Sequence, residues 1–85
     1  MGHVMLTTEQ RDNFRKLVER ASKIAGSSSI HIRVSGRQLA NKTWCVGLIF
    51  GKKGTSEWLK IADVVEADLL EAKQDYRAEL TTMLH

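Results

Sequence analysis

The sequence predicts a small α+β domain in which two helices, one at each end of the chain, cover one face of a short antiparallel sheet. The run Thr43–Phe50, TWCVGLIF, is the most apolar in the chain, and its large side chains fall at every second position, as in a strand with one buried face. Apolar residues at helical spacing precede and follow this run. No proline interrupts any element. The expected order is α-β-β-(β)-α.

Length and composition limit the chain to one domain with one core. It has 85 residues, of which 42% are hydrophobic and 27% charged, as is ordinary for a globular protein. Cys45 is the only cysteine, so no internal disulfide can form and a reducing compartment is expected. No apolar stretch approaches the roughly 20 residues of a membrane span and no signal-peptide pattern is present, so we expect a cytoplasmic protein without a membrane partner. Residues 1–5 are interpreted as flexible or as an added extension.

The net charge of +3 conceals an asymmetry along the chain. Residues 63–85 carry six acidic side chains against Lys73 and Arg77, a balance of −4. The preceding residues carry eleven basic side chains against four acidic ones, a balance of +7. A basic body with an acidic C-terminal helix can bind an anionic partner, or the two parts can attract each other.

The first helix is predicted to begin at Thr7, which forms a capping box with Gln10, while Glu9 suits the positive end of the helix dipole. One apolar stripe follows, made of Phe14, Leu17, Val18, Ala21 and Ile24. Gly26 is predicted to end the helix.

Two strands are predicted next. Residues Ser29–Ser35 alternate strictly, with Ile30, Ile32 and Val34 directed inward and with His31, Arg33 and Ser35 directed outward. Residues Gly36–Lys42 are predicted to form a loop. In the central strand the inward set is Trp44, Val46, Leu48 and Phe50. Residues Gly51–Gly54 then favour a hairpin turn.

The stretch Thr55–Ile61 is ambiguous. A short third strand fits the preceding turn, and it fits the second capping box that Asp63 and Glu66 predict at the start of the last helix. The alternative is a backward extension of that helix, because Trp58 and Ile61 also lie on its apolar face. The stripe of the last helix is Val65, Leu69, Ala72, Tyr76, Leu80 and Met83.

Two helices on one face leave the other face of the sheet open, and this open face is the predicted site of function. One hypothesis is a nucleic-acid interface built on basic residues of the strands and turns, with Trp58 available to stack on a base; these residues are Arg33, Arg37, Lys42, Lys52, Lys53 and Lys60. The alternative is a homodimeric protein-interaction or regulatory module, because small and apolar residues on this face suit an interface better than water; these are His31, Cys45, Gly47 and Ile49. Nucleic acid is the leading partner.

The predicted order resembles that of double-stranded-RNA-binding domains. The resemblance implies a lysine-rich start to the last helix, the element that binds phosphate in that family. Here the same place, residues 62–68, has the sequence ADVVEAD. The resemblance is therefore one of topology alone.

The sequence gives little support to catalysis or metal binding. His31 and Cys45 can pair across adjacent strands as a nucleophile couple, but a lone cysteine in a strand is more typical of a small core residue. The three histidines, His3, His31 and His85, lack metal-ligand spacing. Gly51 and Gly54 lack the lysine-serine ending of a phosphate-binding loop. We therefore expect a non-enzymatic binding module without a cofactor.

Overall fold

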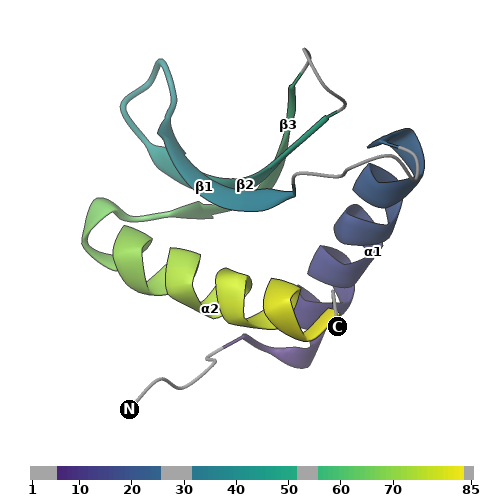
Figure 1. Cartoon of the computed structure of the whole chain (residues 1–85). Helices are drawn as coiled ribbons and strands as arrows, with labels where there is room; N and C mark the ends of the chain where they lie inside the picture. The colour runs from purple at the N-terminus through teal and green to yellow at the C-terminus, as the bar shows by residue number, and fades with distance from the viewer. Residues whose placement is uncertain (1–5, 26–31, 52–55, 84–85) are drawn as a thin grey trace.

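The computed structural model describes residues 6–25, 32–51 and 56–83 (Figure 1). Helix α1 spans Thr8–Ala25, and strands β1, β2 and β3 span Arg33–Gln38, Trp44–Phe50 and Glu57–Val64. A 3₁₀ turn, η1, at Glu66–Asp68 leads into helix α2 at Leu69–Met83. The predicted fold class is confirmed, and so is the third strand.

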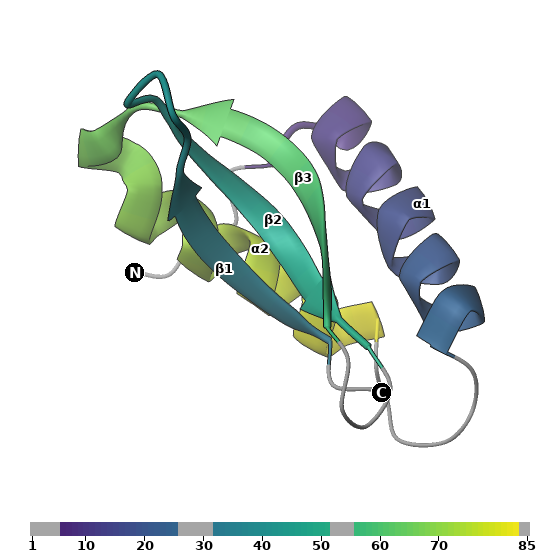
Figure 2. The same ribbon diagram turned by 90° about the horizontal axis from the view of Figure 1, so that it is seen from above.

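Both helices lie on the same face of the sheet. The strands pair antiparallel in the order β1-β2-β3. Helix α2 passes beneath β1 and β2, whereas α1 lies beside β3 and contacts β2 and β3 (Figure 2). Two amphipathic helices and one sheet face are sufficient to enclose a single core.

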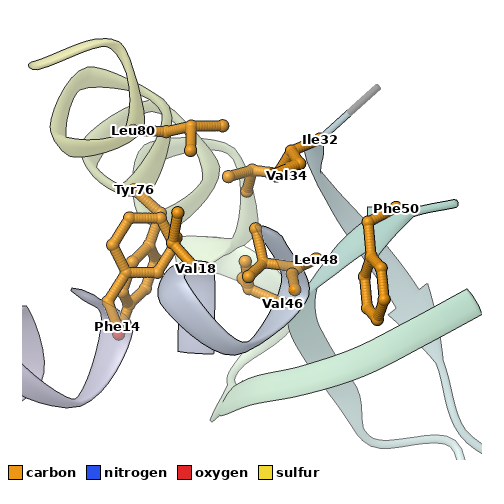
Figure 3. Close-up of a cluster of buried hydrophobic side chains, with 10 residues drawn as sticks. Phe14, Val18, Ile32, Val34, Val46, Leu48, Phe50, Tyr76 and Leu80 are labelled. Atoms are coloured by element: carbon orange, nitrogen blue, oxygen red, sulfur yellow. The ribbon is translucent and has the colours of Figure 1, made fainter. Parts of the chain in front are cut away.

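The core has the predicted faces. Val46, Leu48 and Phe50 of β2 are buried against the helices (Figure 3), whereas Trp44 at the start of the strand is only partly buried. The rings of Phe14 and Tyr76 join the two helices, with centroids 5.1 Å apart and planes tilted by 51°. The remaining members of the buried cluster are Val18, Ala21, Ile32, Val34 and Leu80.

The start of α1 follows the predicted capping box. The Thr7 amide donates to Gln10 Oε1 at 2.9 Å, and the Gln10 amide donates to Thr7 Oγ1 at 3.0 Å. Gly26, the predicted end of the helix, lies outside the described residues.

The first strand is displaced toward the C-terminus relative to its prediction. It begins at Arg33 and continues through Gly36–Gln38, which were predicted as loop; residues 29–31 lie outside the described part of the chain. Gly36 is a strand residue with a packing role, because a Cβ there would lie 2.9 Å from Leu69 Cδ1 of α2. The turn is confined to a few residues, in which the Leu39 amide donates to the Thr43 carbonyl at 2.8 Å.

The predicted start of the last helix at Asp63 is wrong. Asp63 belongs to β3, α2 begins only at Leu69, and Val65, predicted in the apolar stripe, is exposed. Pairing with β2 continues through Asp63 and Val64, past a β-bulge. Val46 pairs with Ala62 but the adjacent Gly47 pairs with Lys60, so Ile61 is an extra residue without a partner on β2.

The bulge changes which side chains share a face of β3. In a regular strand, residues three apart point to opposite faces. Here Lys60 and Asp63 lie on one face, and Lys60 Nζ donates to Asp63 Oδ1 at 2.9 Å and to Oδ2 at 3.0 Å. The carboxylate that the sequence assigns to a helix cap is therefore bound to a lysine of its own strand.

Candidate nucleic-acid interface on the open sheet face

The open face carries three rows of side chains that cross all three strands. The pairing register defines them as the Trp58 row (Arg33, Ile49 and Trp58), the Gly47 row (Ser35, Gly47 and Lys60) and the Cys45 row (Arg37, Cys45 and Asp63). The ends of the strands bend away from the helices, so this face is concave (Figure 1). The three rows form the surface of this concave face.

The Trp58 indole lies across the middle of the open face, over Gly47. A Cβ on Gly47 would lie 2.6 Å from Trp58 Cε2 and 2.7 Å from the Leu59 carbonyl oxygen, and would also collide with Cζ2. Only glycine allows the ring to approach the backbone this closely. The indole is thereby held in the centre of the face and remains partly exposed.

Arg37 covers the indole from the other edge of the sheet. Its guanidinium carbon lies 4.3 Å from the ring centroid, within the range of a cation–π interaction. Arg37 remains exposed. An incoming ligand therefore meets a planar cation above an aromatic ring.

The charge of the open face is positive. Its three rows contain the cations Arg33, Arg37 and Lys60 and the single carboxylate of Asp63, a balance of +2. Hydrogen bonds to Asp63 and the negative charge of that carboxylate raise the pKa of Lys60 above its ordinary value. Lys60 is therefore fully protonated at neutral pH.

The predicted basic residues are only partly brought together. Arg33, Arg37 and Lys60 share the open face, whereas Lys42 lies in the β1–β2 turn with a positive φ of 68°. Lys52 and Lys53 lie outside the described residues.

The predicted interface residues are mostly covered by the chain itself. Cys45 has no exposed surface, its thiol lies 3.5 Å from the Arg37 carbonyl oxygen, and Gly47 is buried under Trp58. Ile49 is partly exposed, and His31 lies outside the described residues. A second molecule on this face would meet Trp58 and Arg37 before Cys45.

Two features of the site were not foreseen in the sequence. The contact between Arg37 and Trp58 joins residues of strands that are not neighbours, and no local pattern reports such a contact. Gly47 did carry a signal, because a glycine inside an otherwise bulky strand is typical of a close approach by another group.

Other types of site were also considered. No group of three or more histidine, cysteine or acidic residues within residues 6–25, 32–51 and 56–83 is arranged to hold a metal ion. Neither α1 nor α2, over the part of each that the structure describes, is long and apolar enough to cross a membrane.

Comparison of the chain with family models, with curated proteins and with solved structures found no match. The fold and the open face define a small α+β domain with an aromatic and basic sheet surface.

Proposed function

We propose that the protein binds single-stranded nucleic acid on the open face of its sheet. The observation that carries this proposal is the Arg37–Trp58 pair at the centre of a concave, positively charged face. Bases stack on aromatic rings and on guanidinium planes, and such stacking contributes about 1–3 kcal/mol per base. Arg33 and Lys60 lie in the same or the adjacent row, where they can contact phosphates.

A single strand fits this face better than a duplex. Bases reach an aromatic side chain on a sheet only when they are unstacked from a helix. The turn η1 and the first turn of α2, the place that the topology of duplex-RNA-binding domains would assign to phosphate, instead carry Glu66, Asp68 and Glu71. Those carboxylates repel a duplex backbone.

The alternative function is self-association through the same face. Ile49 and Trp58 would be its apolar contacts. Because Cys45 and Gly47 are covered within the chain, little further apolar surface is available for such an interface. The mass in solution, measured by light scattering with and without an oligonucleotide, separates the two functions.

The test of the proposed function is the affinity for a labelled oligothymidylate or oligouridylate at low salt, measured by fluorescence anisotropy. We expect Trp58→Ala to weaken binding about 5- to 150-fold, because the ring that holds the Arg37 guanidinium as a stacking surface is lost. Arg20→Gln is the matched control, because Arg20 is an exposed cation of α1, the helix on the opposite side of the sheet. Binding by the parent protein should also fall steeply as salt rises.

Circular dichroism must show that the Trp58 variant remains folded, and Trp58→Phe, which keeps an aromatic ring, should retain more of the affinity. A parent protein that binds neither DNA nor RNA at low salt, or a folded Trp58→Ala variant with unchanged affinity, would contradict the proposal.

A further inference from the structure

A groove runs along the outer edge of β1, between that strand and α2. Its volume is about 510 Å³, and it is lined by residues 32–35 of the chain, Ile49 of β2, and Arg77, Leu80 and Thr81 of α2. We call it the β1-edge groove. Its lining does not include Arg37 or Trp58, the pair on which the proposed function rests.

The polar groups of this groove favour an anion. Arg33 and Arg77 lie among its lining residues, and no carboxylate does among the described residues that line it. Arg77 Nη2 donates to the Val34 carbonyl oxygen at 3.5 Å, which directs the side chain toward β1. A guanidinium carries five N–H donors, so this one long bond leaves others for a ligand. The Thr81 hydroxyl donates to the Arg77 carbonyl at 3.0 Å, so the arginines are the main donors.

The acidic side of α2 faces elsewhere. At 3.6 residues per turn, Asp75 is about 200° around the helix from Arg77. Asp75 and Glu71 line a separate depression together with Asp68 and Ala72. The carboxylates of this helix therefore do not cancel the charge of Arg77 in the groove.

The groove is continuous with the open face. Arg33 and Ile49 line the groove and also belong to the Trp58 row. Since neighbouring strands are about 4.8 Å apart, the backbones of β3 and β1 are separated by about 10 Å along this row. That distance exceeds the 3.4 Å rise per phosphate of one stacked strand, so more than one nucleotide is needed to reach from Trp58 to the groove.

From this continuity we propose that a bound single strand crosses the sheet from β3 to β1, perpendicular to the strands. One base stacks on the Arg37 guanidinium that lies over Trp58, the chain passes over Ile49, and its phosphates enter the β1-edge groove between Arg33 and Arg77. This path rests on the proposed function, and it adds Arg77 of α2 to a binding surface otherwise formed by the sheet.

The test compares oligothymidylates of increasing length on the parent protein, on Arg77→Gln and on Lys73→Gln. Glutamine keeps an N–H donor for the Val34 carbonyl, and Lys73 is a cation of the same helix that does not line the groove. We expect Arg77→Gln to leave the affinity for a dinucleotide unchanged and to weaken binding of longer oligomers about 3- to 10-fold. For this variant, the slope of log affinity against log salt concentration should also be shallower by about 0.7, the value for one phosphate contact of a single strand. Lys73→Gln should match the parent protein at every length.

The outcomes separate this path from the proposed function. If the parent protein binds and Trp58→Ala weakens binding, but Arg77→Gln has no effect at any length, the path is wrong and the function stands. If Arg77→Gln loses binding of oligoglutamate but keeps the parent affinity for every oligothymidylate, the groove is an acidic-peptide site and the path is again wrong. If the parent protein binds no oligonucleotide, both proposals fail.

Discussion

At the scale of single residues, the open face depends on the absence of a side chain at position 47. The Trp58 indole lies against the backbone of Gly47, and Arg37 lies over the ring. Any larger residue at this position would displace the indole from the sheet backbone and change its contact with the guanidinium group. Gly47 is thus a structural requirement for the Arg37–Trp58 pair, although it has no side chain to offer a ligand.

We expect Gly47→Ala to destabilise the fold by about 1–3 kcal/mol, the typical cost of overpacking a well-filled position. The added methyl group would collide with a side chain and with the Leu59 carbonyl, and the latter cannot rotate away. Gly36→Ala is the matched control within the same sheet, because there the methyl group would meet only the flexible end of Leu69. Urea unfolding measures both. Equal losses for the two variants would contradict this account of Gly47.

Single-residue patterns predicted the core face of β2 apart from Trp44, but they did not predict the burial of Cys45 and Gly47 or the face of Trp58 in β3. The alternation of large and small residues in TWCVGLIF correctly predicted that Val46, Leu48 and Phe50 are buried. The stretch around Trp58 has no such alternation, because Leu59, Ile61, Ala62 and Val64 do not keep a period of two. The face of Trp58 therefore depends on pairing with β2, which is a tertiary property.

At the scale of elements, α1 and α2 are joined by a cluster of charges. Glu79 is buried in α2; its Oε2 accepts a hydrogen bond from Arg15 Nε at 2.8 Å and lies 2.7 Å from Arg15 Nη2 as an ion pair. Arg11 Nε lies 3.4 Å from Oε1 without forming a hydrogen bond, so it contributes charge only. These contacts link the basic part of the chain to its acidic C-terminal part, as the alternative interpretation of the charge asymmetry required.

A double-mutant cycle of Arg15→Ala and Glu79→Ala should give a coupling energy of about 1 kcal/mol. The value is modest because the Arg15 side chain is 47% exposed, although the Glu79 side chain is only 7% exposed. A cycle on Lys60 and Asp63, both well exposed, is the comparison and should give a smaller coupling. Thermal or urea unfolding provides the data. A coupling no larger than that of the exposed pair would show that Glu79 does not hold the helices together.

The boundaries of elements were less predictable than their order. Asp63 and Glu66 form a sequence pattern that indicates a helix start, but pairing with β2 continues β3 through both Asp63 and Val64, past the bulge at Ile61. A bulge has no local sequence signature in this chain. Sequence periodicity therefore predicted that α2 exists, but it placed the start of the helix too early, at Asp63 instead of Leu69.

At the scale of the whole molecule, stability should depend on alkaline pH through Tyr76. Burial raises the pKa of Tyr76 above its ordinary value of 10.0, and the nearby Asp75 carboxylate raises it further. The neutral phenol is thus favoured in the folded state. Its contribution to stability is complete below pH 10 and is lost as the pH rises toward the folded-state pKa, because the unfolded chain releases this proton first.

We expect the free energy of unfolding to fall more steeply above about pH 10 in the parent protein than in Tyr76→Phe, as this linkage requires. The phenylalanine ring keeps the packing against Phe14, so the two proteins should differ little at neutral pH. Tyr76 is the only tyrosine in the chain, so phenolate absorbance reports its ionisation directly. Identical pH profiles for the two proteins, measured by urea unfolding, would exclude this linkage.

The bulge at Ile61 also limits the growth of the sheet. A three-stranded sheet has two outer strands, and a long regular outer strand is a template for adding further strands from other molecules. The unpaired residue interrupts the spacing of hydrogen-bonding groups along β3, and the charged side chains of Glu57, Lys60 and Asp63 lie on the same strand. Both features oppose open-ended polymerisation. The extra residue that places Asp63 beside Lys60 therefore also makes the outer edge of β3 a poor template for a further strand.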